Sequence, residues 1–338
     1  MNIVFVHFGP QLPKHLRRNL TRVVKLFDGH DVFLISDHAH SNLPSSVRKF
    51  HVSERPYFRS AETNLSHPVD FRNNFWFLTL KRFLVFNLFM EEHPDPLIHL
   101  ESDVVISQDF PFEIFAGLAT PFAFPLISDL MGIPSVLFLK DKSAADLLCE
   151  LTMQCVEEDP NTIDMLILKK LLSCSPDLIT ILPSGPSSKK FYTSETSDNF
   201  VSMQSVGLSI FGGIFDGAAI GQYLLGDDPR NNRGIRNIYF ESGYSSLVAR
   251  SLSFDLSANR AFLEVVSEFE RIPLFSIHVH SKDIRVFDEE GFVKVIALRI
   301  RNIGGELRKE FLVAVATRQS ILALRRRLKL LRKIRKHG

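Results

Sequence analysis

The chain has 338 residues, 45% of them hydrophobic and 23% charged, which is the composition of an ordinary globular protein. Its three cysteines form no CxxC pair and have no histidine at zinc spacing, which excludes a disulfide framework and a structural zinc site and predicts a reducing compartment. Residues 299–338 carry 13 Lys/Arg and 2 Asp/Glu, a net charge of +11. Because the whole chain has a net charge of +2, residues 1–298 have a net charge of −9. This acidic charge disfavours a nucleic-acid-binding core.

The N-terminal segments alternate between strand and helix patterns. Residues 2–9 are an apolar run that ends in glycine, residues 12–27 have apolar positions at helical spacing, and residues 31–37 form a second apolar run. A strand, a helix and a strand at this spacing predict a βαβ unit and a parallel sheet. Residues 53–72 are polar and predict a loop, and residues 73–93 predict a long apolar helix that ends before Pro94.

The middle of the chain continues the α/β pattern. Strands are expected at 97–106, 121–128, 134–140, 178–184, 275–282 and 292–300, and helices at 143–158 and 162–172, the second with Thr162 as a possible N-cap. Residues 184–200 predict a loop, and residues 211–234 a glycine-rich segment with one short helix. The expected fold class is therefore α/β, a mixed but mainly parallel sheet flanked by helices, over a domain of residues 1–298.

The C-terminal residues 299–338 differ from this domain in charge. Ile321, Leu324, Leu328 and Leu331 recur at helical steps among arginines and lysines, which predicts a basic amphipathic helix. Such a helix can bind an anionic membrane surface, pack on a partner protein, or remain solvated. The N-terminus lacks the features of a signal peptide, and no apolar run is long enough for a membrane-spanning helix. We therefore expect a cytoplasmic chain that can lie at the inner face of the membrane.

The segment LIHLESDVVI, residues 97–106, places Glu101 and Asp103 inside an apolar run. Carboxylates are rarely buried unless they are paired or hold a cation. Mg²⁺ and Mn²⁺ favour such oxygen ligands, and ligands bind at the carboxyl edge of α/β sheets. The pair therefore indicates either a metal site or a solvated strand end.

A second group lies near residue 280. His278 and His280 would face the same side of a strand, and Lys282 follows its end. An imidazole that binds a metal, beside a lysine that neutralises a leaving phosphate, suits a metal-bound diphosphate. The alternative is a pair of surface histidines on a hairpin.

Three further residues are candidates for contacts with a ligand. Asp216 opens a segment of small residues, where it either caps a helix or serves a binding loop. Asp164 either acts as a first-turn charge on its helix or contacts substrate. Arg82, like Lys81, lies on an apolar helix, where it either extends to solvent or meets an anionic ligand. The GxGxxG and P-loop motifs are absent from the sequence.

Together these residues resemble the nucleotide-sugar-dependent glycosyltransferases of the GT-A fold. Four segments carry the resemblance: FWFLTLKRF (75–83), HLESDVVI (99–106), FDGAAIGQYLLGDDPRN (215–231) and HVHSK (278–282). The second is similar to the DxD-type motif, although Glu101 replaces the usual first Asp. The chain is similar, over roughly residues 1–290, to bacterial or viral transferases for lipopolysaccharide, capsule or related glycans.

The resemblance implies a nucleotide-sugar donor held by a divalent cation, Mn²⁺ or Mg²⁺. Asp103 and one of the two histidines, His278 or His280, would bind the metal, and Glu101 would reach the ribose or a water on the metal. Lys282 would stabilise the departing diphosphate, and Asp216 would orient or deprotonate the acceptor hydroxyl.

Arg82 and Asp164 complete the implied donor site. The implied acceptor is a glycan or lipid-linked glycan in cell-surface polysaccharide synthesis, with no nucleic acid as a partner. Two alternatives remain: a sugar nucleotidyltransferase, or a catalytically silent scaffold of the same fold that binds a glycan or is tethered to a membrane.

Overall fold

A computed structural model describes residues 1–53, 74–128, 131–192, 196–221, 252–255, 259–265, 270–282 and 284. The expected loop at 53–72, apart from residue 53, the strand at 292–300 and the basic helix of residues 299–338 lie outside the described residues, as does the part of the glycine-rich segment after residue 221. Among the described residues, no helix is both long enough and apolar enough to cross a membrane.

Within the described residues, the larger sheet has eight strands in the order β3-β2-β1-β4-β8-β6-β7, with β9 paired to β6. All of its strands except β7 and β8 run in the same direction, because β4 and β6 each pair antiparallel with β8. The mixed, largely parallel sheet flanked by helices confirms the expected fold class. Its strands are β1 (Asn2–His7), β2 (Asp31–Ser36), β3 (Val47–His51), β4 (Leu97–Leu100), β6 (Phe122–Ser128), β7 (Met131–Gly132), β8 (Val136–Leu139) and β9 (Ile179–Leu182).

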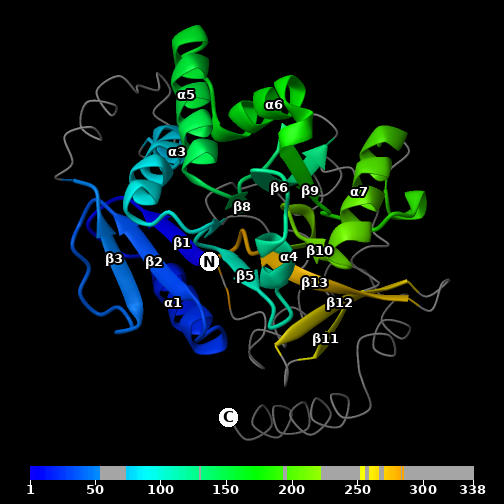
Figure 1. Cartoon of the computed structure of the whole chain (residues 1–338). Coiled ribbons are helices and arrows are strands. Elements are labelled where there is room, and N and C mark those ends of the chain that lie inside the picture. Colours follow the sequence, from blue (N-terminus) through cyan, green and yellow to red (C-terminus); the bar gives the residue numbers. More distant parts are fainter. Residues whose placement is uncertain are drawn as a thin grey trace, which may run out of the picture.

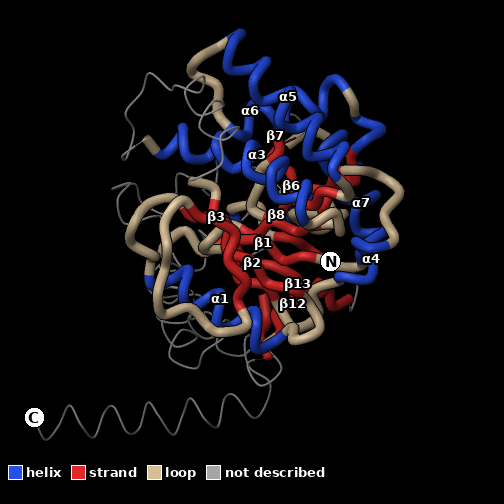
Figure 2. The backbone as a smooth tube through the Cα atoms, turned by 60° about the vertical axis from the view of Figure 1, so that its left-hand side comes forward, coloured by secondary structure: helices blue, strands red, loops and turns tan. Residues whose placement is uncertain are grey.

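Helices cover both faces of this sheet, as Figures 1 and 2 show. On one face lie α3 (Phe75–Glu92), α5 (Lys142–Glu158) and α6 (Asp164–Cys174); on the other lie α1 (Lys14–Leu26) and the short α4 (Phe112–Ala116). Alternation along β1 divides the core, since Val4 packs with the α3 side and Ile3 and Phe5 pack with the α1 side. Helix α3 is buried around nearly its whole circumference between the sheet and α5, which explains its continuous apolar sequence.

A second sheet, of five strands in the part of the chain that the structure describes, lies beside the first (Figure 1). Its order is β10-β13-β12-β11, and β5 also pairs with β13, through residues 276–278 of that strand. Helix α7 and the single-turn helices η1 and η2 complete the described elements. The bounds are β5 (Val104–Ile106), β10 (Ile214–Phe215), β11 (Leu252–Asp255), β12 (Arg260–Val265), β13 (Glu270–His278), α7 (Asp198–Phe211), η1 (Pro176–Leu178) and η2 (Lys189–Phe191).

Three sequence predictions were wrong in detail. The apolar run 97–106 is two strands, because β4 belongs to the large sheet and β5 to the second. The expected loop 184–200 contains the start of α7, where the Ser197 hydroxyl accepts a hydrogen bond from the Phe200 N–H and caps the helix. Thr162 is not the cap of α6, whose N-cap residue is Ile163.

Candidate active site

The turn between β4 and β5 carries Glu101, Ser102 and Asp103 from one sheet to the other. The Val104 N–H donates to the Glu101 carbonyl at 3.0 Å and closes the turn. Helix α1 holds it from outside, because the Asn19 side-chain amide donates to the carbonyl oxygens of Ser102 at 3.3 Å and Val104 at 2.7 Å. The two carboxylates therefore lie on a turn whose backbone is held by hydrogen bonds, at the carboxyl end of β4.

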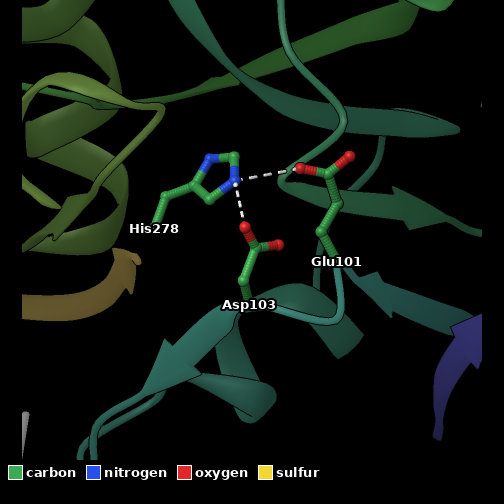
Figure 3. A group of neighbouring side chains, drawn as sticks. All are labelled: Glu101, Asp103 and His278. Carbon is green, nitrogen blue, oxygen red and sulfur yellow. Dashed lines mark ion pairs between the residues drawn. The ribbon is translucent and has the colours of Figure 1, made fainter. Parts of the chain in front are cut away.

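His278 reaches the same place from the far end of the chain. It is the last residue of β13, where it pairs with Val104 of β5. Its Nδ1 bonds to the Gly217 carbonyl at 2.7 Å and must therefore carry a proton, since a carbonyl only accepts. Its Nε2 then faces the two carboxylates, 3.3 Å from Glu101 Oε2 and 3.4 Å from Asp103 Oδ2 (Figure 3).

The buried charges of this group shift one another's pKa. Burial lowers the pKa of His278, but the charge and hydrogen bond of Asp103 outweigh burial and raise it to about 9. Burial raises the pKa of Asp103, but the charges of His278 and Lys282 hold it well below its usual range. Asp103 is thus a carboxylate at neutral pH, although it is 3% exposed.

The same side chains fit a divalent cation. One atom each of Glu101, Asp103 and His278 lie within 4.8 Å of one another. Carboxylate oxygens with one imidazole nitrogen suit Mn²⁺ or Mg²⁺, and a histidine that donates its other ring N–H to a backbone carbonyl is the usual arrangement for a metal ligand. The Lys282 ammonium contacts Asp103 Oδ2 from the turn that follows β13.

Of the two candidate histidines, His278 is the one whose ring nitrogen belongs to the group with both carboxylates among the described residues. The strand ends at His278, and His280 lies in the following turn, with its ring stacked on that of His278 at 4.0 Å between centroids. His280 is not part of the group of potential metal ligands found among the described residues.

Arg82 links the site to two helices. From α3, its guanidinium donates to Glu101 Oε1 and to Asp164 Oδ2 of α6, both at 2.5 Å. Burial lowers the pKa of Arg82, but the two carboxylates outweigh burial and raise it. Burial raises the pKa of Asp164, and the Arg82 charge opposes this only in part. The alternative in which Arg82 extends to solvent is excluded, since the residue is buried.

His99, which was not among the predicted site residues, lies in β4 and contacts Arg82. Its Nδ1 donates to the Val4 carbonyl at 3.1 Å, and its Nε2 accepts from Arg82 Nη1 at 3.4 Å. Burial and the neighbouring Arg82 charge lower the pKa of His99 well below 6.5, so the ring is neutral. The sequence feature that could have identified His99 is a polar residue within the apolar run that forms β4, where a buried polar group needs a partner.

Asp216 lies next to the site, but its carboxylate is bound by backbone groups. Its carboxylate accepts hydrogen bonds from the backbone N–H groups of Ile220 at 3.0 Å, Gly221 at 2.7 Å and His278 at 3.0 Å. It is 1% exposed, and burial raises its pKa. With both oxygens engaged, Asp216 fixes the backbone beside His278, and this geometry does not fit the expected contact with an acceptor hydroxyl.

Neither a described protein family nor a curated protein matches this chain. Among solved structures, it is similar to the galactosyltransferase LgtC in complex with donor and acceptor sugar analogs, at 14% identity over 54% of this chain and 74% of that one, with a TM-score of 0.40. The PaToxG glycosyltransferase is 11% identical over 52% of this chain and 68% of that one, with a TM-score of 0.37. Mouse xyloside xylosyltransferase 1, apo form, is 10% identical over 54% and 85%, also with a TM-score of 0.37.

Proposed function

We propose that this chain is a nucleotide-sugar-dependent glycosyltransferase that uses a divalent cation. The observation that carries the proposal is the convergence of Glu101, Asp103, His278 and Lys282 from two distant segments onto one point between two sheets. Three potential metal ligands beside a lysine form a site for a metal-bound diphosphate. The reason to propose that this diphosphate carries a sugar is the sequence resemblance to GT-A glycosyltransferases.

In this proposal, Asp103 and His278 bind Mn²⁺ or Mg²⁺, with Glu101 beside them. The metal, when bound, neutralises charge on the diphosphate of the donor. Lys282 adds a positive charge next to the leaving diphosphate, which favours departure of the nucleotide. Arg82 holds Glu101 and Asp164 in fixed positions at the donor side of the site.

Asp216 has a positioning role in this proposal. It binds the His278 N–H while the Gly217 carbonyl binds the ring Nδ1–H, so the two contacts fix the backbone and the ring of one metal ligand, whose Nε2 would give up its proton when the metal binds. The group that takes the proton from the acceptor hydroxyl is therefore another one.

The acceptor in this proposal is a glycan, or a lipid-linked glycan at an anionic membrane surface, in cell-surface polysaccharide synthesis. The support is the sequence of residues 299–338, whose net charge of +11 contrasts with the −9 of residues 1–298. A cationic segment of this kind attracts anionic lipid. It would bring the acidic body to the inner membrane face, where a lipid-linked acceptor lies.

The proposal is tested by calorimetry with UDP, GDP and dTDP, with and without Mn²⁺. We expect one nucleotide to bind with Mn²⁺, and Asp103→Asn to weaken that binding at least about tenfold. Asp31→Asn is the control, because Asp31 forms an exposed ion pair with Arg48. If no nucleotide binds, the enzyme proposal is wrong and a silent scaffold is favoured; if binding is equal without Mn²⁺, the metal role of Asp103 is wrong.

A further inference from the structure

Lys282 and the metal ion compete for the same atom. Asp103 Oδ2 is the oxygen that Lys282 Nζ contacts, and it is also the Asp103 oxygen that lies 3.4 Å from His278 Nε2. A divalent cation coordinated by that oxygen and by the His278 nitrogen would lie against the ammonium. The metal ion and the Lys282 ammonium, both in contact with one carboxylate oxygen, would repel each other strongly in a site with little water.

The two partners of this ion pair differ in their freedom to move. The Asp103 side chain is 5% exposed, whereas that of Lys282 is 31% exposed. A lysine side chain has a flexible four-carbon stem, so its ammonium can leave while the carboxylate stays. Lys282 is therefore the partner that yields when a metal binds.

The backbone keeps Lys282 close to the site wherever its ammonium points. The Val279 N–H donates to the Asp103 carbonyl at 2.8 Å, and the Lys282 N–H donates to the Val279 carbonyl at 2.8 Å. Lys282 has a φ of +61°, a left-handed conformation that is unfavourable for a residue with a side chain. The turn is thus anchored directly to the backbone of the metal ligand.

From these contacts we propose that Lys282 occupies the metal position on Asp103 in the free protein and moves to the diphosphate when metal and nucleotide bind. This second role of Lys282 rests on the proposed function. It makes the binding of metal and nucleotide cooperative, because the metal must displace the ammonium and the diphosphate offers it a new partner. The ammonium weakens binding of the metal alone and strengthens binding of the pair.

The test measures Mn²⁺ binding to the full chain without nucleotide, by electron paramagnetic resonance of free Mn²⁺. We expect Lys282→Met to bind Mn²⁺ about tenfold more tightly than the unmodified chain, since the competing charge is gone. Lys282→Gln, which removes the charge but keeps a polar end, should do the same, and Lys282→Arg should bind like the unmodified chain.

Lys142→Met is the matched control, because the Lys142 side chain is also 31% exposed and also pairs with an aspartate, Asp146. Its Mn²⁺ affinity should be unchanged. Repeating the titration with saturating UDP or GDP measures the cooperativity, which should fall in Lys282→Met and Lys282→Gln.

Equal or weaker Mn²⁺ binding by both neutral variants would overturn the inference, as would an equal gain in Lys142→Met. The metal-only titration separates this result from failure of the proposed function, because it requires no nucleotide. If neither the unmodified chain nor any variant binds Mn²⁺ while a nucleotide still binds, the inference is overturned and a metal-independent transferase remains.

Discussion

At the scale of single residues, the site depends on how the buried charges are balanced. Arg82 is the one fixed cation in contact with both Glu101 and Asp164 within the described part of the chain, and all three side chains are largely removed from water. Removing one partner of a buried ion pair leaves an uncompensated charge, which costs far more than the loss of an exposed pair. Arg82 should therefore matter for stability as well as for donor binding.

Arg82→Met should lower the free energy of unfolding by about 3–5 kcal/mol, because the buried Asp164 carboxylate loses its ion-pair partner and Glu101 keeps only His278. Arg48→Met is the matched control: Arg48 pairs with Asp31 at 2.9 Å, but their side chains are 58% and 46% exposed. Its loss should cost less than about 1 kcal/mol. Guanidinium chloride unfolding measures both, and similar small losses in the two variants would show that the Arg82 network is not a buried ion-pair network.

His99 should make stability depend on pH in a defined direction. Its pKa is well below 6.5 in the folded state, so as the pH falls below 6.5 the unfolded chain binds a proton that the folded chain does not. Stability should fall below pH 6.5, with a contribution from His99 of up to about 1.4 kcal/mol per pH unit. His99→Gln can keep both hydrogen bonds without titrating, so its loss on acidification should be smaller. Denaturant unfolding in EDTA between pH 5 and 7 compares the two, and parallel curves would refute the assignment.

At the scale of elements, the sequence predicted most helices and strands of the large sheet because their patterns are local. The spacing of Leu16, Leu20 and Val23 is enough to predict α1. Helix α7 was not predicted because its buried positions include Gln204 and Gly207, which interrupt the apolar pattern expected of a helix face. The break in the run 97–106 was missed for another reason: strand pairing with β13, a distant segment, decides that β5 leaves the large sheet.

The turn of helix that begins at residue 219 packs directly against the end of β13. A Cβ on Gly221 would lie 1.9 Å from the His278 carbonyl oxygen, so only glycine allows this approach. Gly221→Ala should displace His278 and weaken Mn²⁺ binding about tenfold or more. Gly29→Ala, where a Cβ meets nothing within 4 Å, should leave it unchanged. Mn²⁺ titration of the two variants measures the effect, and unchanged affinity in Gly221→Ala would contradict the role of this contact.

At the scale of the whole molecule, the candidate site lies where the two sheets meet. The sequence could name Glu101, Asp103, His278 and Lys282 as candidates because each has a recognisable chemical pattern. The sequence could not predict the ion pair between Arg82 and Asp164 or the contact of His99 with Arg82, because these contacts depend on how α3, α6 and β4 pack. Nor could it show that the oxygens of Asp216 are engaged by backbone groups.

The charge asymmetry of the chain predicts membrane binding. The full chain should co-sediment with vesicles that contain anionic lipid, since each basic residue near such a surface contributes about 1 kcal/mol. Deletion of residues 318–338 should abolish this binding, and high salt should weaken it. Vesicles of neutral lipid alone are the control. Unchanged sedimentation after the deletion would show that the basic segment is not a membrane anchor.

In the proposed function, the group around Asp103 transfers a sugar from a nucleotide-sugar donor. The most direct measurement is release of nucleoside diphosphate from a panel of UDP-, GDP- and dTDP-sugars by the full chain, with Mn²⁺ and with EDTA. We predict release from at least one donor with Mn²⁺, none above background with EDTA, and a loss of about a hundredfold or more in Asp103→Asn. Release that persists in EDTA and in Asp103→Asn, or the absence of release from every donor, would show that this group does not carry out metal-dependent sugar transfer.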